Sequence, residues 1–234
     1  MTSCRYAIYF APNPDSLLWR LGSSWLGRDA ATGRMLAQPS ITGMTASDVA
    51  AITEMPARYG FHATLKPPFR LREGTTEAEF LRDVKVFAAT RSPTVIPGLR
   101  VRTIRNFVAL TLPDDIPAVS ELAAAGVEVF DPYRAPQGEK ELEKRFQAGL
   151  SSREEKLLQR WGYPFVMDAY RFHMTLTGAL SAAEADKVCA ALASHFATVT
   201  SQPVTVDAIA VFEQRAPDAS FLILGRFPFR AGGF

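Results

Sequence analysis

The chain has 234 residues, of which 47% are hydrophobic and 21% charged, and its formal net charge is +2. These values are those of an ordinary globular protein with one large domain or two small ones, and no apolar run approaches the roughly 18 residues of a membrane span. The small net charge disfavours a nucleic-acid-binding surface as the main function and is compatible with a small anionic substrate.

The start of the chain and its cysteines favour a cytoplasmic protein. The apolar run at residues 6–11 is too short for a signal peptide and is followed by Pro12 and Pro14. The two cysteines, Cys4 and Cys189, lie far apart in the sequence without any partner spacing, which fits a reducing compartment. We expect no cofactor, no membrane contact and no obligate protein partner.

Periodicity and turn residues predict the elements of the first half in chain order. A strand at residues 5–11 and an amphipathic helix at 15–26 come first, and a strand at 59–65 follows. Thr76 and Glu79 form a capping box that opens a helix to about Ala89. Beyond a Ser-Pro break, the expected strands lie at residues 94–104 and 107–112.

The connection between the halves is expected to be helical. Residues 115–126 predict one helix, and the Pro-containing stretch 130–136 breaks the chain after it. A pair of charged helices is expected at residues 138–150 and 152–161, the second opened by a capping box of Ser152 and Glu155. We expect this pair to be a solvated cover over one lobe.

The second half repeats the order of strand, helix and hairpin. The expected elements are a strand at residues 170–176, a helix from the capping box of Ser181 and Glu184 to about Phe196, and strands at 204–212 and 221–227. The shared order argues for a duplicated architecture with a pseudo-twofold axis. We expect one bilobal domain with lobe 1 at about 1–115, a helical connection at about 116–165 and lobe 2 at about 166–234.

One seven-residue phrase occurs in both halves. Residues 59–65 (YGFHATL) and 170–176 (YRFHMTL) share the frame Tyr-x-Phe-His-x-Thr-Leu and contain two of the three histidines. Successive side chains of a β-strand point to opposite faces. Each copy therefore has an apolar face, and on the other face it presents one imidazole beside one hydroxyl: His62 with Thr64, and His173 with Thr175.

Two histidines that flank a common centre can support acid–base chemistry on a phosphodiester. One imidazole can accept a proton from the attacking nucleophile while the other donates a proton to the leaving oxygen. The threonine hydroxyls can donate hydrogen bonds to the non-bridging oxygens. By the same alternation, Lys66 and Arg171 lie on the polar faces and are expected to bind the phosphate.

Two other interpretations of the paired histidines stay open. A metal site is one, although each motif supplies one ligand per strand and contains no further His, Cys or carboxylate. The other is that both histidines are structural and recur because the fold was duplicated. The hydroxyl at the same offset and on the same face favours function. His195 has no such context and is expected to be structural.

The paired His-x-Thr-Leu motifs in a duplicated strand-helix-hairpin chain resemble the two-histidine (2H) phosphoesterase superfamily. This superfamily includes RNA 2',3'-cyclic phosphodiesterases and 2'-5' RNA ligase-like proteins. Further segments resemble a bacterial branch of phosphonate-metabolism proteins: residues 5–12 (RYAIYFAP), 25–29 (WLGRD), 58–66 (RYGFHATLK) and 161–164 (WGYP). The resemblance covers nearly the whole chain. The double motif is specific for the superfamily, whereas the other segments serve to place the branch.

The resemblance implies an α+β fold of two lobes, with two antiparallel sheets flanked by helices around a central cleft. It implies metal-independent cleavage of cyclic or 2'-5' phosphodiesters, and it assigns the catalytic roles to His62, Thr64, His173 and Thr175. The branch suggests a ribosyl cyclic phosphate as the substrate. Further residues are candidates for shaping the pocket, each with an equally strong structural interpretation: Tyr9, Arg58, Tyr133, Arg134 and Tyr163.

Three functions follow from these observations. The leading one is hydrolysis of a small cyclic phosphodiester, such as a ribose cyclic phosphate formed during phosphonate degradation. The second keeps the chemistry but acts on RNA ends, and it predicts a basic track for which Arg100, Arg102 and Arg105 are the best candidates. The third is binding of a phosphorylated ligand without turnover. The two motifs are nearly equivalent, so either histidine can be the base.

Overall fold

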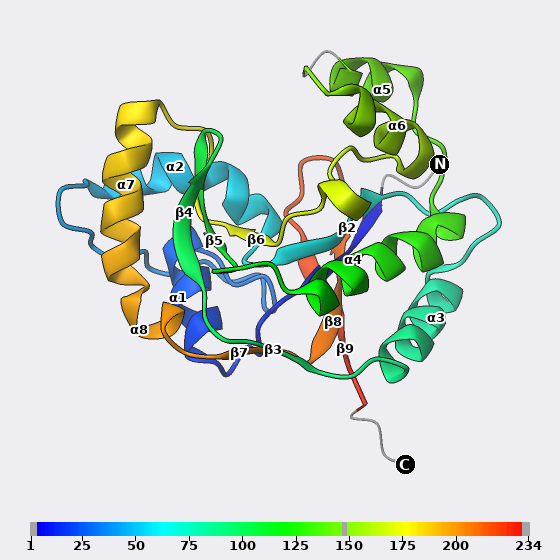
Figure 1. Cartoon of the computed structure of the whole chain (residues 1–234), viewed down its shortest axis with the longest axis horizontal. Helices are drawn as coiled ribbons and strands as arrows, with labels where there is room; N and C mark the ends of the chain where they lie inside the picture. The colour runs from blue at the N-terminus through cyan, green and yellow to red at the C-terminus, as the bar shows by residue number, and fades with distance from the viewer. Residues whose placement is uncertain (1–3, 147–148, 231–234) are drawn as a thin grey trace.

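The computed structural model describes residues 4–146 and 149–230. Its strands form a seven-stranded antiparallel sheet of order β4-β5-β6-β2-β1-β8-β9 and a separate two-stranded sheet of β3 and β7 (Figure 1). Helices flank the sheets, so the fold is α+β, as predicted. The strands are β1 (Arg5–Phe10), β2 (Ala63–Phe69), β3 (Thr94–Ile96), β4 (Arg100–Ile104), β5 (Phe107–Thr111), β6 (His173–Thr175), β7 (Val204–Val206), β8 (Ala208–Gln214) and β9 (Leu222–Pro228). The helices are α1 (Leu17–Leu26), α2 (Ala46–Tyr59), α3 (Glu77–Ala89), α4 (Pro117–Phe130), α5 (Glu139–Phe146), α6 (Ser152–Trp161), α7 (Ala182–His195) and α8 (Ala197–Thr200).

Side-chain caps determine where several helices begin. The capping boxes predicted for α3 and α7 are both present. Helix α6 covers the expected residues 152–161, but its capping box lies one position earlier than expected: the hydroxyl of Ser151, and not that of Ser152, accepts from the backbone N–H of Glu154. Helix α2 was not expected at all, and it opens with a capping box of Thr45 and Asp48.

Each half of the chain completes the sheet of the other half. The hairpin β4–β5 from the first half pairs through β5 with β6 from the second, and the hairpin β8–β9 from the second half pairs through β8 with β1. Helix α7 packs against β4, and helix α3 packs against β9 (Figure 1). The seven-stranded sheet therefore spans both expected lobes, and the pairing of strands does not follow the boundaries at residues 115 and 166.

Strands from the two halves also pair directly with each other. Strand β2 pairs with β6, with Ala63 opposite Met174, and strand β3 pairs with β7, with Val95 opposite Thr205. The expected strand at 94–104 is two strands, because Pro97 and Gly98 separate β3 from β4. The structure thus has two antiparallel sheets, as expected, but they are unequal in size.

Helix α1 holds both histidine motifs in place. A Cβ atom at Gly22 would lie 2.4 Å from the ring of Phe61, so the helix backbone lies directly against the first motif. The indole Nε1 of Trp25 donates a 2.7 Å hydrogen bond to the backbone carbonyl of Leu176 in the second motif. Trp25 and Phe61 are both fully buried. One helix therefore anchors the apolar sides of the two motifs at once.

The helical connection extends further than the sequence indicates. Helix α4 runs to Phe130, four residues beyond the expected end at 126. Helix α5 covers Glu139–Phe146 of the helix expected at 138–150, and residues 147–148 of that expectation lie outside the described residues.

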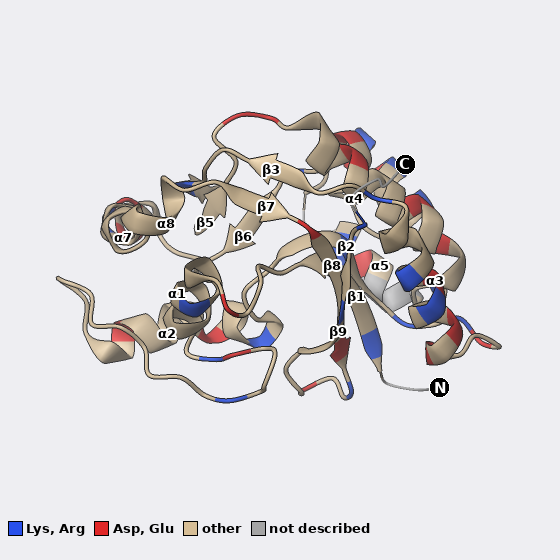
Figure 2. Cartoon of the chain, turned by 90° about the horizontal axis from the view of Figure 1, so that it is seen from below, with Lys and Arg blue, Asp and Glu red and all other residues tan. Residues whose placement is uncertain are grey.

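Figure 2 shows charged residues mainly on the helices and loops, while the central strands carry few. Within residues 4–146 and 149–230, every helix is too short or too polar to span a bilayer.

Candidate active site

The sheet brings the two motifs side by side on adjacent strands. Because β2 and β6 are antiparallel with Ala63 opposite Met174, the register places His62 across from Thr175 and Thr64 across from His173. Directly opposed residues of an antiparallel pair have their Cβ atoms about 5 Å apart. All four side chains line one cavity with a volume of about 310 Å³. The predicted catalytic residues are thus together in a single site.

The apolar faces of the motifs form the wall behind this site. Phe61, Ala63 and Leu65 are at most 2% exposed, and Phe172 and Met174 are at most 6% exposed. The alternation predicted for the motifs is therefore confirmed, although the regular strands are shorter than the motifs. Tyr59, the first residue of the first motif, is the last residue of α2 and lines the cavity.

Backbone carbonyls hold both imidazoles in the same way. The Nδ1 atom of His62 is 2.8 Å from the carbonyl oxygen of Gly60, and the Nδ1 atom of His173 is 2.8 Å from the carbonyl oxygen of Arg171. A carbonyl oxygen can only accept, so Nδ1 carries the proton in each contact. In the neutral imidazole, Nε2 then has the free electron pair. Each histidine is therefore oriented to accept or donate a proton through Nε2.

The surroundings of His62 are more constrained than those of His173. The ring of Tyr9 stacks on the imidazole of His62, with centroids 3.7 Å apart and an interplanar angle of 19°. The hydroxyl of Thr64 is 3.3 Å from Nε2 of His62 and can donate to it. The nearest ring to His173 is that of Phe107, at 5.8 Å and tilted by 51°. Tyr9 is thus part of the site, as predicted.

Burial favours the neutral form of both histidines. Removal from water lowers the pKa of His62 to about 4; the Gly60 carbonyl opposes this shift, and His173 adds a smaller lowering. Removal from water also lowers the pKa of His173, against the contact with the Arg171 carbonyl. Both imidazoles line the same cavity, so one bound group can contact both of them. An anion between them would stabilise the charged form of either ring.

Arginines give the cavity a positive potential. Arg5 and Arg145 line it, and no carboxylate is among the described residues that do so. The Nε atom of Arg5 donates a 2.7 Å hydrogen bond to the Gln214 side chain, and the guanidinium of Arg145 lies 5.2 Å from the ring centroid of Tyr163. The cavity is therefore suited to an anion. Tyr163 was predicted to shape it, whereas the two arginines were not.

Lys66 does not reach this cavity, because a β-bulge turns it away. Tyr9 pairs with Thr64 but Ile8 pairs with Lys66, so Leu65 is an additional residue in β2 and the alternation shifts there. Lys66 is 1% exposed, and its Nζ donates a 3.1 Å hydrogen bond to the backbone carbonyl of Val127 in α4. The expectation that Lys66 shares the polar face of Thr64 is therefore wrong.

The other basic and phenolic candidates also lie outside the cavity. Arg171 is exposed, and its guanidinium donates to the backbone carbonyls of residues 168 and 170. Arg58 donates to the backbone carbonyl of residue 217. The Tyr133 hydroxyl donates to the carboxylate of Asp83, and Arg134 pairs with Asp131. Arg58, Tyr133 and Arg134 do not converge on the paired histidines, whereas Arg171 lines a neighbouring cavity together with Thr64 and His173.

A second cavity adjoins the site on the side of His173. It has a volume of about 420 Å³, and Thr64, Tyr163 and His173 line both cavities. Its walls are largely apolar and aromatic, with Phe107 and Phe165 among them. The guanidinium of Arg105 lies 4.8 Å from the ring centroid of Phe165 and pairs with Glu154 at 3.5 Å. We call this space the aromatic cavity.

The described side chains do not form a metal cluster. Across residues 4–146 and 149–230, no group of three or more His, Cys, Asp or Glu is placed to hold an ion. The third histidine, His195, ends α7 with its ring 6.2 Å from that of Trp25, and it does not line the cavity.

Comparison with known proteins finds a family, two curated relatives and a solved structure. The family described as "Protein of unknown function (DUF1045)" matches residues 64–222. A protein named ribose 1,5-bisphosphate phosphokinase PhnN from Janthinobacterium sp. (strain Marseille) is 42% identical over 98% of this chain and 51% of its own length. A protein of the same name from Laribacter hongkongensis (strain HLHK9) is 40% identical over 93% of this chain and 50% of its own length. The chain thus spans about half the length of these relatives. A solved structure described as "Crystal structure of phosphoesterase" is similar over 98% of this chain and 99% of its own, with 10% identity and a TM-score of 0.42.

Proposed function

We propose that this chain, which belongs to the DUF1045 family of proteins of unknown function, is a phosphodiesterase of the two-histidine type that hydrolyses a small cyclic phosphodiester. The observation that carries the proposal is the matched geometry of the two motifs. His62 directly precedes β2 and His173 begins the adjacent strand β6; each has Nδ1 held by a carbonyl at 2.8 Å, and each has a threonine of the opposite motif across from it.

The proposed reaction uses the two histidines in opposite protonation states. Nε2 of one neutral imidazole accepts a proton from water, whose oxygen forms the new bond to phosphorus. The ester bond of the ring breaks, and Nε2 of the other, protonated imidazole donates its proton to the leaving oxygen. Water is thereby added across one P–O bond, and the product is a phosphomonoester with a free hydroxyl. The negative charge of the bound substrate favours protonation of one ring.

Threonines and arginines stabilise the phosphate in this proposal. The hydroxyls of Thr64 and Thr175 donate to the non-bridging oxygens, on which charge accumulates. Arg5 and Arg145 attract the anion into a cavity without a lining carboxylate among the described residues. No step of this scheme requires a metal ion or an organic cofactor.

The names of the relatives support a phosphorylated sugar as substrate. Two proteins of about twice this length are named for a kinase that forms or uses ribose 1,5-bisphosphate, and this chain matches one half of each. The chain contains no Gly-Lys pair, which the phosphate-binding loop of P-loop kinases requires. We therefore assign phosphodiester cleavage to this chain, and we take a ribose cyclic phosphate of phosphonate breakdown as the leading substrate.

We also propose that the two halves arose by duplication. The antiparallel pairs β2 with β6 and β3 with β7 each join equivalent segments, which a twofold axis between the halves would require. The capping boxes that open α3 and α7 lie at equivalent positions after the two motifs. The exchanged hairpins β4–β5 and β8–β9 fit the same symmetry.

Phosphorus NMR of purified protein with a set of cyclic phosphodiesters tests the function. In excess EDTA, a ribose 1,2-cyclic phosphate should open to a monoester with a bell-shaped dependence of rate on pH. His62→Ala and His173→Ala should each lose turnover while retaining affinity, which separates an enzyme from a protein that only binds the ligand. An absolute requirement for an added divalent metal would contradict the mechanism.

The aromatic cavity favours a second candidate, an RNA-end 2',3'-cyclic phosphodiesterase. Phe107 and Phe165 line a space of about 420 Å³ next to His173, and aromatic side chains of this kind stack on bases. A preference of about tenfold or more in kcat/KM for nucleoside 2',3'-cyclic phosphates over ribose cyclic phosphates would establish this candidate in place of the first. Binding to oligonucleotides should then weaken steeply with salt.

A further inference from the structure

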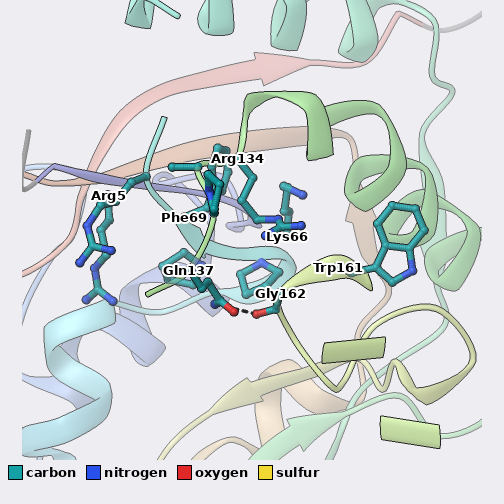
Figure 3. Close-up of a pocket in the computed structure, with 12 residues that line it drawn as sticks. Arg5, Lys66, Phe69, Arg134, Gln137, Trp161 and Gly162 are labelled. Carbon is teal, nitrogen blue, oxygen red and sulfur yellow. Dashed lines mark hydrogen bonds between the residues drawn. The ribbon is translucent and has the colours of Figure 1, made fainter. Parts of the chain in front are cut away.

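A small space lined by basic side chains lies next to the cavity that contains the paired histidines, which we call the catalytic cavity. Four cationic residues line the small space, Arg5, Lys66, Arg70 and Arg134. Figure 3 labels Arg5, Lys66 and Arg134. Arg5, together with Pro67 and Pro68, lines both this space and the catalytic cavity, so the two adjoin. We call it the basic pocket. It contains two residues, Lys66 and Arg134, for which the sequence predicts phosphate binding or a role in shaping the substrate pocket.

Two cations of the basic pocket share one carboxylate. Asp131 is the carboxylate that pairs with both Lys66, at 3.7 Å, and Arg134, at 2.8 Å. One carboxylate compensates one of these two charges. Arg5 donates to the neutral side-chain amide of Gln214, which leaves its charge uncompensated at that contact. Lys66, Arg134 and Asp131 together therefore carry a net positive charge, which an anion would neutralise.

Lys66 makes this surplus costly because it is buried. The β-bulge in β2 directs its side chain inward, where it is 1% exposed and donates to the Val127 carbonyl. A buried charge is expensive unless it is paired. Burial lowers the pKa of Lys66 to about 8, Asp131 opposes this shift, and Arg134 lowers the pKa further. A bound anion would relieve the repulsion between Lys66 and Arg134.

The size of the pocket limits what enters it. The enclosed space is about 20 Å³, somewhat more than the roughly 10–15 Å³ that a single water-sized group needs. One terminal oxygen of a phosphate fits this space, with the remaining oxygens at the mouth. Figure 3 shows Lys66 and Arg134 close together and Arg5 to one side of them, while the Gln137 side chain donates to the Gly162 carbonyl at 2.9 Å. Arginine and lysine in such a group are typical partners of phosphate.

We propose that the basic pocket binds a phosphate group distinct from the one between the histidines. Two sources share this chemistry: a second phosphate on the substrate, and free inorganic phosphate that acts on the enzyme from outside the reaction. The first source rests on the proposed function, since it requires a phosphodiester in the catalytic cavity. The second does not.

Calorimetric titration with inorganic phosphate tests the pocket without turnover. The protein is the His62→Ala/His173→Ala double variant, with and without Arg134→Gln. Loss of a charged hydrogen bond of about 1.5–3 kcal/mol corresponds to roughly a 10- to 150-fold weaker affinity. Arg34→Gln removes the same charge from an exposed position outside the pocket and should leave the affinity unchanged. If Arg134→Gln unfolds the protein, Arg70→Gln takes its place. Equal phosphate affinity with and without the pocket arginine would overturn the proposal.

Kinetics of the enzyme with intact histidines separate the two sources. For a substrate phosphate, Arg134→Gln should lower kcat/KM by about tenfold or more for a ribose cyclic phosphate with a 5-phosphate, and not for the same sugar without it. For free phosphate, added inorganic phosphate should change the rate with the sugar that lacks the 5-phosphate, and Arg134→Gln should abolish that response. If neither sugar is turned over, the proposed function fails, while the calorimetric result still decides the phosphate site.

Discussion

Replacement of Gly60 by alanine should destabilise the protein, because alanine would be strained in this backbone conformation and would clash with Ala30. Gly60 joins α2 to His62 with φ 82° and ψ 176°, a conformation that is essentially restricted to glycine. An alanine there costs about 1–3 kcal/mol in backbone strain. Its Cβ would also lie 2.5 Å from the Cβ of Ala30, and overpacking of this kind costs a further 1–3 kcal/mol or so. We expect Gly60→Ala to lower the free energy of unfolding by about 2–6 kcal/mol.

The matched control for this substitution is Gly74→Ala. Gly74 also has a positive φ of 80°, but a Cβ there would meet nothing within 4 Å, so the cost is limited to about 1–2 kcal/mol of backbone strain. Urea denaturation followed by tryptophan fluorescence gives both values. Because the Gly60 carbonyl holds Nδ1 of His62, Gly60→Ala should lower kcat as well, whereas Gly74→Ala should not. Equal losses of stability in the two variants would refute the reasoning from Ala30.

Further predictions concern the histidines and Tyr9. His62→Ala and His173→Ala should each reduce kcat by roughly 100- to 10,000-fold in a phosphodiesterase assay, and the double variant should lose little more than either single one. Burial lowers the pKa of His62 to about 4, so the folded state binds this proton less readily than the unfolded state, whose histidine has a pKa of about 6.5. Stability should therefore be full above pH 6.5 and fall as the pH drops toward 4, by up to about 3 kcal/mol, and urea denaturation of His62→Gln should show a smaller fall. Tyr9→Leu removes the stacked ring at 3.7 Å and should lower kcat/KM by about threefold to tenfold, whereas Tyr9→Phe should change it little; equal kcat/KM values for the two variants would show that the stacked ring is unimportant.

The arrangement of the paired histidines and threonines could be predicted because it depends on local alternation. His62, Thr64, His173 and Thr175 are two residues apart within each motif, and a strand places such pairs on one face whatever the rest of the fold does. The same argument failed for Lys66, because a β-bulge at Leu65 depends on pairing with β1 and has no signal of its own in the motif.

The sequence analysis did not assign Arg5 and Arg145 to the cavity, for two different reasons. Arg5 lies four residues before Tyr9 on β1, so alternation along the strand could have placed both on the same face. Arg145 reaches the cavity from α5, and nothing in a charged helix marks which residue will point at a distant strand.

Helix α2 was missed because it buries few residues, among them Val49 and Pro56, and so has no continuous apolar stripe.

The division of the chain was the least predictable part of the fold. The repeated order of strand, helix and hairpin indicates duplication but does not state which strand each hairpin will join. In the structure, β5 joins β6 and β8 joins β1, so the hairpins are exchanged between the halves. Such pairings between distant segments are determined by the whole sheet and not by any local sequence.

Because the hairpins are exchanged between the halves, the site depends on both halves of the chain. Strands β2 and β6 position the two histidine motifs at the centre of a sheet whose other strands come from both halves of the chain. A segment containing one half would lack the other motif strand and also the hairpin that pairs with its own β1 or β6, so neither half can retain a partial site. Pairings at such long sequence separation also form late and slowly in folding. Catalytic competence should therefore arise as an all-or-none property of the complete chain, and proteolytic cleavage between the halves should abolish it as soon as the two fragments separate.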